Sequence, residues 1–167
     1  MVVSGPPGSG KSTLGRALAD HLDLPYLAKD TVKEALADVL GADDVDGSRR
    51  LGRAAVATLL AVATDDGRGV LDATWRPALA RNDLAALPGE VVEVHCACPP
   101  ELARRRYARR AADRHAVHFD RDRTDDPDLW AGDATRAIGG PWPVVTVDTT
   151  TPVDVAGVAD AITARLR

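Results

Sequence analysis

Residues 5–13 carry the clearest chemical signal in this 167-residue chain, because glycines at three positions precede a lysine and two hydroxyl side chains. The stretch fits the P-loop pattern G-x-x-x-x-G-K-[ST], in which glycines let successive backbone N–H groups surround an anion. Lys11 is placed to reach the β- and γ-phosphates of a nucleotide, and the Ser12 hydroxyl is placed to bind Mg²⁺. We therefore predict that ATP binds to Gly5, Pro6, Pro7, Gly8, Ser9, Gly10, Lys11, Ser12 and Thr13.

A strand before this loop and a helix after it must hold the loop in place. Residues 1–4 are mostly apolar and predict a short strand, and residues 11–22 place leucines at helical spacing. The N-terminal end of such a helix carries a partial positive charge that would face the phosphates. This context favours a true P-loop over a glycine turn that binds nothing.

Two carboxylates follow predicted strands. Asp30 lies between a strand at residues 24–27 and a helix at residues 31–40, and Asp72 lies in a strand at residues 69–74. Ligands of open α/β sheets bind at the carboxyl ends of the strands, so both side chains are candidates for the site. Asp72 could hold a Mg²⁺-bound water or contact the substrate. Each could instead be a helix or turn cap, a role that Asp fills well.

Helices and strands alternate along the rest of the chain. This order predicts an α/β fold, in which a five-stranded, doubly wound parallel sheet is covered by helices on both faces. The length suits one domain, residues 1–167. The remaining predicted helices are residues 48–64, 77–87, 99–112, 129–138 and 153–166, and the remaining predicted strands are residues 90–97 and 143–148.

A helix dense in arginine leads into a charged segment. Five of the seven residues from Arg104 to Arg110 are arginine, which indicates a solvated face or a cleft that stabilises phosphate charge. Residues 113–126 are too polar to bury a core of their own, and we expect a mobile flap there, named here the lid segment. His115 and His118 in this segment are predicted to contact the lid or the substrate rather than a metal.

Composition excludes several classes of protein. The net charge of −4 gives no global basic field, so a nucleic-acid partner is not expected. No 18-residue apolar run and no signal-peptide pattern occur, from which we expect a cytoplasmic protein with no membrane contact. Cys96 and Cys98 read as small apolar residues of a strand. The chain could be a monomer or a homodimer.

The sequence resembles the small P-loop kinases of the nucleoside/nucleotide kinase-like group. Within that group it is similar to AAA-type ATP-binding proteins related to gluconate kinase, chloramphenicol phosphotransferase and the kinase domain of phage polynucleotide kinase. The resemblance covers nearly the whole chain and is carried by residues 5–13, 29–33, 71–74 and 100–110.

The resemblance implies roles for particular residues. Asp30 would be the general base that accepts a proton from the acceptor hydroxyl. Arg106 and Arg110 match the paired catalytic arginines of the lid, and a shift of one residue would select Arg105 and Arg109 instead. The turn that follows the last strand would hold the adenine of ATP, through Thr149 and Thr150.

These patterns predict an ATP-dependent phosphotransferase that uses Mg²⁺ and moves a phosphoryl group to a hydroxyl of a small metabolite or antibiotic. No signature names the acceptor. Nucleosides, nucleotides and polynucleotide 5′-hydroxyl ends stay open as alternatives, as does a non-catalytic, regulatory ATP-binding protein. By position, the acceptor site is predicted to include Asp30, Lys33, Asp72, Thr74, Arg76, Arg114, His115 and His118.

Overall fold

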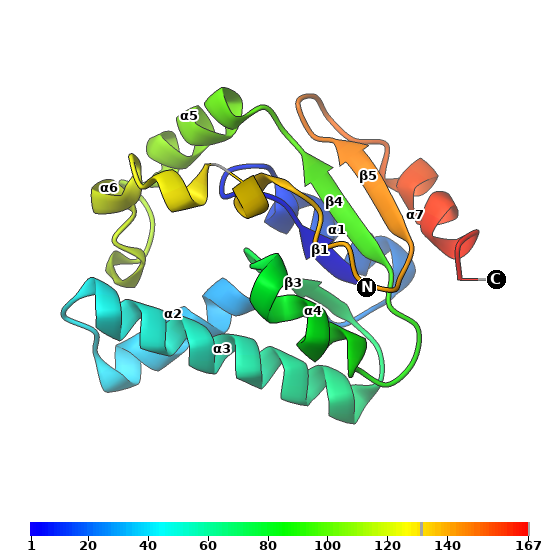
Figure 1. Ribbon diagram of the computed structural model, residues 1–167, viewed down its shortest axis with the longest axis horizontal. Coiled ribbons are helices and arrows are strands. Elements are labelled where there is room, and N and C mark those ends of the chain that lie inside the picture. Colours follow the sequence, from blue (N-terminus) through cyan, green and yellow to red (C-terminus); the bar gives the residue numbers. More distant parts are fainter. Residues whose placement is uncertain (131, 167) are drawn as a thin grey trace.

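Five parallel strands form the centre of the molecule (Figure 1). The computed structural model describes residues 1–130 and 132–166, with only the backbone at residues 121, 122, 128 and 134. The spatial order of the strands is β2-β3-β1-β4-β5, so β1, which leads into the P-loop, lies in the middle. This sheet confirms the fold class predicted from the sequence. The strands are β1 (Val2–Ser4), β2 (Tyr26–Ala28), β3 (Val70–Asp72), β4 (Glu93–Ala97) and β5 (Val144–Asp148).

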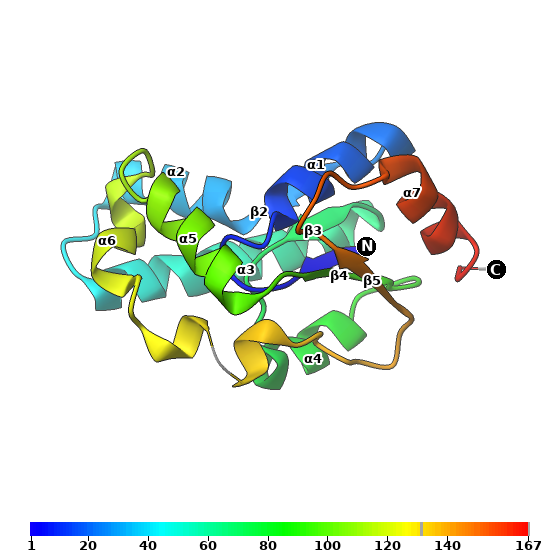
Figure 2. The same cartoon turned by 90° about the horizontal axis from the view of Figure 1, so that it is seen from above.

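Helices cover both faces of the sheet, as Figure 2 shows. On one face, α1 (Lys11–Leu22) and α7 (Val155–Thr163) pack on a core that includes Val3. On the other face, α3 (Val45–Asp66) and α4 (Pro77–Ala85) pack on a second core that includes Val2. Successive side chains of a strand point to opposite faces, so adjacent valines of β1 serve different cores.

Three further helices and several short turns lie beyond the carboxyl ends of the strands. α2 (Lys29–Leu40) packs along α3, and α5 (Pro100–Arg110) leads to the lid segment. The lid segment contains the 3₁₀ turn η1 (Ala116–His118) and the short helix α6 (Asp120–Arg123). Figure 1 shows α5 and α6 on one side of this end and the α2–α3 pair on the other.

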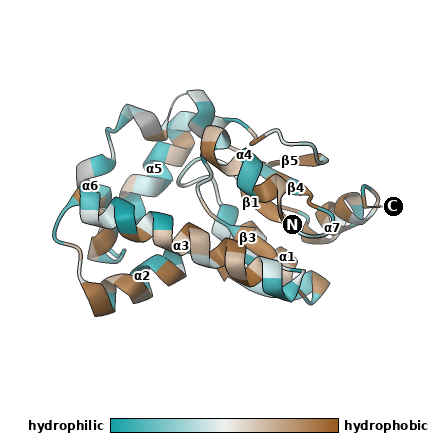
Figure 3. Ribbon diagram, turned by 60° about the horizontal axis from the view of Figure 1, so that its bottom comes forward, coloured by the Kyte–Doolittle hydropathy of each residue, from teal (hydrophilic) through white to brown (hydrophobic). Residues whose placement is uncertain are grey.

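Several predicted boundaries move for local reasons. α3 begins at Val45 rather than at residue 48, because the Asp44 side chain accepts a hydrogen bond of 2.6 Å from the Gly47 N–H and caps the helix. The predicted apolar stripe of α2 ends early, since Val39 is 82% exposed and Leu40 67% exposed. Figure 3 shows this hydrophobic end of α2 next to the α2–α3 connection.

The helix predicted at residues 129–138 is wrong. Two short 3₁₀ helices, η2 (Pro127–Leu129) and η3 (Gly132–Thr135), occur there instead. The fully buried Glu93 carboxylate explains the difference, because it accepts hydrogen bonds from the Ile138 N–H at 2.7 Å and the Trp142 indole at 3.1 Å. A buried carboxylate needs such partners, and supplying them draws this chain segment out of helical geometry. Within the described residues, no helix is long and apolar enough to span a bilayer.

Candidate active site

The P-loop connects β1 to α1 and has the backbone geometry of an anion cradle. Gly8 and Gly10 have φ angles of 77° and 92°, a region that favours glycine. A Cβ atom on Gly8 would overlap the carbonyl oxygen of Ala103, so the loop can lie directly on α5 only because this residue is glycine. Gly10 is the N-cap of α1 and offers no side chain, which leaves the first N–H groups of the helix for a ligand.

Two cationic side chains beside the loop fit a triphosphate. Lys11 is buried, and its Nζ atom donates a hydrogen bond of 2.8 Å to the carbonyl oxygen of Pro6. Burial lowers the pKa of Lys11, so a nearby anion would stabilise its charged form. Arg110 lines the same cleft. Its buried Nε atom is one of two buried side-chain polar atoms that have no hydrogen-bond partner among the described residues. These residues fit the phosphates of ATP.

The carboxyl ends of β2 and β3 bring two carboxylates to this cleft. The strands pair Ala28 with Asp72, and Asp30 follows two residues after Ala28. Asp72 is buried, and the Tyr26 hydroxyl donates to its Oδ2 atom at 2.6 Å. The other oxygen of Asp72 and the exposed Ser12 hydroxyl could both serve Mg²⁺.

A magnesium ion would need further ligands at this point. The part of the chain that the structure describes holds no group of three or more His, Cys, Asp or Glu side chains suited to a metal. Mg²⁺ commonly binds through one or two protein oxygens together with substrate phosphates and water. The arrangement of Ser12 and Asp72 therefore fits an ion that arrives with a nucleotide.

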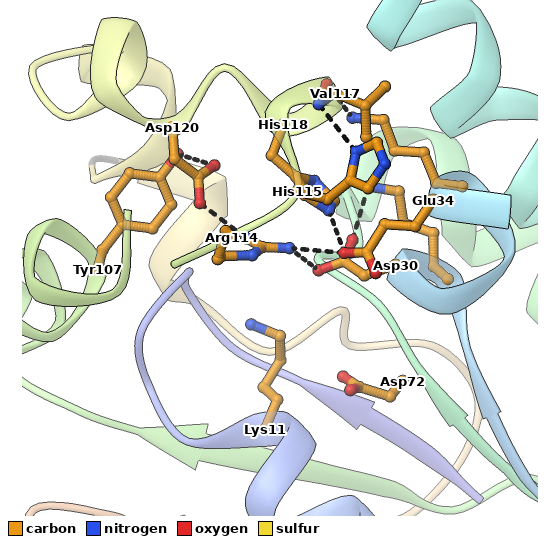
Figure 4. A network of polar contacts seen from close by, with 12 residues as sticks. Lys11, Asp30, Glu34, Asp72, Tyr107, Arg114, His115, Val117, His118 and Asp120 are labelled. Carbon is orange, nitrogen blue, oxygen red and sulfur yellow. Dashed lines mark hydrogen bonds and ion pairs between the residues drawn. The ribbon is translucent and has the colours of Figure 1, made fainter. Parts of the chain in front are cut away.

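Asp30 lies in the first turn of α2 and is ion-paired. Its Oδ2 atom accepts a hydrogen bond of 2.7 Å from Arg114, and its Oδ1 atom lies 3.5 Å from the Lys29 ammonium. Burial acts to raise the pKa of Asp30, but the charges of Lys29 and Arg114 outweigh it and hold the pKa well below its usual range. Figure 4 shows Arg114 between Asp120 and Asp30, with Lys11 pointing toward this group from α1.

The lid segment is docked on α2 and α3. Val117 is buried in a small apolar cluster with Ala37 and Leu51. His118 donates to Glu34 at 2.6 Å, and the His115 ring lies 3.0 Å from Asp38. The two histidines thus contact α2, as Figure 4 shows for His118 and Glu34. The lid segment was predicted to be too polar to bury a core of its own, and that prediction did not foresee that Val117 would anchor the segment in this cluster.

The arginines of α5 divide between the site and the solvent. Arg105 and Arg109 are exposed, whereas Arg106 and Arg110 are partly buried. Arg110 stacks over the Tyr107 ring at 5.4 Å and lines the cleft. Of the two registers considered from the sequence, this placement favours the pair Arg106 and Arg110.

Arg106 contacts the turn after β5 rather than the P-loop cleft. Its guanidinium donates to the carbonyl oxygens of Thr149 at 2.9 Å and Thr150 at 3.0 Å. A Cβ atom on Gly10 would lie 3.7 Å from Thr149, so this turn is next to the start of α1. The structure therefore brings together one predicted arginine and the turn predicted to hold adenine.

The residues predicted to form the acceptor site do not all lie in the cleft. Thr74 lines the cleft with Asp30 and Asp72. Arg76 is exposed at the N-cap of α4, outside the cleft lining. Lys33 is buried between α2 and α3, where it donates to Ser48 at 2.7 Å and to the Val117 carbonyl at 3.2 Å.

Sequence reasoning missed three residues that surround the site. Tyr26 bonds Asp72, Glu34 bonds His118, and Asp120 accepts from both Arg114 at 2.9 Å and Tyr107 at 2.6 Å. Asp120 is buried although it lies in a run of charged residues, and no local pattern distinguishes it from its neighbours. Only the tertiary contacts identify these residues.

Two shikimate kinases are among the curated relatives of this chain. The protein from Salinispora tropica is 37% identical over 110 residues, which are 62% of this chain and 63% of the relative. The protein from Salinispora arenicola is 38% identical over 109 residues, with the same coverage. The chain thus matches just under two thirds of the length of these relatives.

Solved structures share the whole fold. A protein of Chloroflexus aurantiacus that is assigned provisionally as a kinase has 29% identity and a TM-score of 0.82, with 99% of this chain and 97% of the other covered. A shikimate kinase from Acinetobacter baumannii in complex with shikimate has 20% identity and a TM-score of 0.52, covering 97% and 89%.

At that lower identity the second likeness concerns the fold alone. The sequence itself matches the AAA domain family over residues 1–127, which include the P-loop, Asp30, Asp72 and the lid segment. The resemblance to small P-loop kinases is thereby confirmed, and the chain belongs to the AAA domain family.

Proposed function

We propose that this protein is an ATP-dependent kinase that transfers the γ-phosphoryl group of Mg·ATP to a hydroxyl of a small, strongly polar metabolite. One observation carries the proposal: Lys11, Asp30, Asp72 and Arg110 line a single cleft beside the P-loop. A phosphate cradle and a carboxylate for an acceptor hydroxyl are the two parts that such a transfer requires. The names of the curated relatives, which are kinases, support the same activity.

The phosphate side of the cleft would stabilise negative charge. Lys11 and Arg110 are buried or partly buried cations, and in such a site their charges act more strongly than they would in water. Ser12 and Asp72 would hold Mg²⁺, which neutralises charge on the phosphate oxygens when it is bound. These residues account for most of the rate in a reaction whose transition state is loose.

Asp30 would orient the acceptor hydroxyl and take its proton. The acceptor oxygen forms a bond to the γ-phosphorus while the bond from that phosphorus to the β–γ bridging oxygen breaks. ADP leaves with the bridging oxygen, and the proton passes to Asp30. The low pKa of Asp30 does not oppose this role, because the hydroxyl proton is lost late in a loose phosphoryl transfer and orientation matters more than basicity.

The lining of the cleft favours a polar acceptor. Among the described residues, those that line the cleft include no aromatic and no large aliphatic side chain. The lining residues are Gly8, Gly10, Lys11, Ser12, Thr13, Asp30, Asp72, Ala73, Thr74 and Arg110. A ligand with an apolar body would find little to pack against there. Shikimate, for which the similar kinases are named, is a hydroxylated acid of this kind.

The experiment is a screen for ADP release from Mg·ATP. The panel contains hydroxy acids such as shikimate and gluconate, sugars and polyols, nucleosides, antibiotics, and oligonucleotides with a 5′-hydroxyl. We expect a polar hydroxylated metabolite to raise ADP release well above the rate without acceptor, and Asp30→Asn to remove the increase. If turnover is strongest with an antibiotic, nucleoside or oligonucleotide, the proposed class of acceptor is wrong, but the kinase activity stands.

A different outcome would contradict the proposed kinase activity. If no member of the panel raises ADP release while Mg·ATP binds tightly, the protein is better described as an ATP-binding regulatory protein. The Asp30–Arg114 ion pair would then be a structural contact rather than a resting state of the site.

A further inference from the structure

We propose that Lys33 is a positioning residue that fastens the lid segment to α2 and α3 and thereby holds Arg114 against Asp30. The fastening is a property of the fold, and only its effect on phosphoryl transfer rests on the proposed function. Lys33 acts through the backbone carbonyl of Val117 and does not line the cleft.

The polar contacts of Lys33 converge on one carbonyl group. Its Nζ atom donates to the Val117 oxygen at 3.2 Å and to the Ser48 hydroxyl at 2.7 Å, and that hydroxyl donates to the same oxygen at 2.5 Å. Residues from α2, α3 and η1 thus meet at a single point. Lys33 is only 4% exposed, so these bonds form away from solvent.

The ammonium group of Lys33 is costly to bury. Among the side chains that the structure describes, no carboxylate forms an ion pair with it, so its hydrogen bonds and the more distant charge of Asp30 compensate the lost hydration. An apolar side chain would fill the same space at less cost. The role that a lysine adds is to donate hydrogen bonds to the lid segment.

The held carbonyl lies close to Arg114 along the chain. Val117 is three residues after Arg114, and the intervening turn is stiffened because the His115 ring accepts a hydrogen bond of 3.1 Å from the Val117 N–H. The Val117 side chain also fills the apolar cluster between α2 and α3. Fixing Val117 therefore limits where the Arg114 guanidinium can lie, 2.7 Å from Asp30 and 2.9 Å from Asp120.

Each of the other side-chain contacts between the lid segment and α2 has at least one partner that is accessible to water. In the His115–Asp38 contact, the two side chains are 32% and 69% exposed, and in the His118–Glu34 contact, His118 is 5% and Glu34 36% exposed. Exposed ion pairs contribute little to stability, whereas a buried hydrogen bond to a charged group contributes more. Lys33 is therefore the contact whose loss should release the lid segment.

Limited trypsin digestion tests the fastening without any acceptor. Cleavage after Arg114 or Arg123 requires the lid segment to leave α2 and α3. We expect Lys33→Met to speed cleavage within residues 113–126 about tenfold, and Ser48→Ala to speed it less, since each removes a donor to Val117. The matched control is Arg81→Met on α4. It removes a hydrogen bond of 2.8 Å to the Ile138 carbonyl and should leave lid cleavage unchanged.

Kinetics separate positioning from a general loss of structure. With the acceptor found, Lys33→Met should lower kcat/KM for that acceptor about tenfold while the Kd for Mg·ATP stays within twofold. Lid cleavage by trypsin at the wild-type rate in both Lys33→Met and Ser48→Ala would overturn the proposal. If Lys33→Met speeds lid cleavage but the wild type has no kinase activity, the role of Lys33 in fastening the lid stands and the proposed function is wrong.

Discussion

The P-loop cleft and the docked lid segment lie at the same end of the sheet but are built differently. The P-loop of the cleft comes from nine consecutive residues, 5–13, which carry their own turn geometry. The lid is held by contacts between residues far apart in the chain, such as Lys33 and Val117, which are 84 residues apart. Phosphate binding is thus encoded locally, whereas the acceptor side depends on tertiary packing.

The two regions also differ in charge pairing. In the lid, Arg114 is shared between Asp30 and Asp120. In the cleft, the Nε atom of Arg110 is buried and has no hydrogen-bond partner among the described residues, and Lys11 is bonded to a backbone carbonyl of its own loop. The cleft is therefore arranged to receive an anion, while Arg114 of the lid is already paired, with Asp30 of α2 and with Asp120. Variants in the cleft should affect nucleotide binding and transfer, and variants in the lid should affect the acceptor.

The largest effect is expected at Lys11. Lys11→Ala removes the buried cation at the end of the P-loop, and we expect transfer to fall by about 10³-fold or more together with weaker Mg·ATP binding. ADP release and calorimetric titration with Mg·ATP measure the two effects. Unchanged nucleotide affinity in this variant would remove the P-loop from the account.

A smaller effect should show which pair of α5 arginines is catalytic, Arg106 and Arg110 or Arg105 and Arg109. Arg110→Met should slow transfer by about 10²-fold, because this side chain lines the cleft. The control Arg109→Met changes an exposed neighbour and should stay within about twofold of wild type, as most surface substitutions do. Steady-state kinetics of the two variants measures this difference. A larger loss of transfer in Arg109→Met than in Arg110→Met would assign the catalytic role to Arg109.

The smallest effect concerns stability and pH at Lys33. Burial lowers the pKa of Lys33 to about 8 in the folded protein, from 10.5 for a lysine side chain in water. Between these values the unfolded chain binds more protons at this site, so the free energy of unfolding should rise with pH, by at most about 1.4 kcal/mol per pH unit.

Urea unfolding of wild type and Lys33→Met at pH 7.5 and pH 10 measures this dependence. The difference between the two proteins should move in favour of wild type as the pH rises. A difference that stays constant, or that moves the other way, would show that Lys33 does not carry the lowered pKa.

Local patterns sufficed for the parts of the molecule that local physics determines. Alternating strands and helices predicted the sheet, and the glycine spacing predicted the loop whose φ angles the structure shows at Gly8 and Gly10. The position of Asp30 and Asp72 at strand ends followed from the same reasoning, because all parallel strands end at one edge. Their presence in one cleft agrees with that prediction.

Long-range contacts account for what the sequence could not predict. The apolar spacing of residues 129–138 is compatible with a helix, but the buried carboxylate of Glu93, some 45 residues earlier, takes the Ile138 N–H instead. Likewise, Lys33 was predicted at the acceptor site from its place near Asp30, and the structure buries it under Val117. Nothing near these residues in the chain indicates their distant partners.

The most direct test of the account compares wild type with Asp30→Asn in a single turnover of Mg·ATP and the acceptor found by the screen. We expect transfer to fall by about 10²- to 10⁴-fold in the variant. The Kd for Mg·ATP should stay within twofold, since Asp30 is ion-paired to the lid and is not part of the P-loop. A variant that transfers phosphate at the wild-type rate would contradict the role of Asp30 and, with it, the assignment of this cleft.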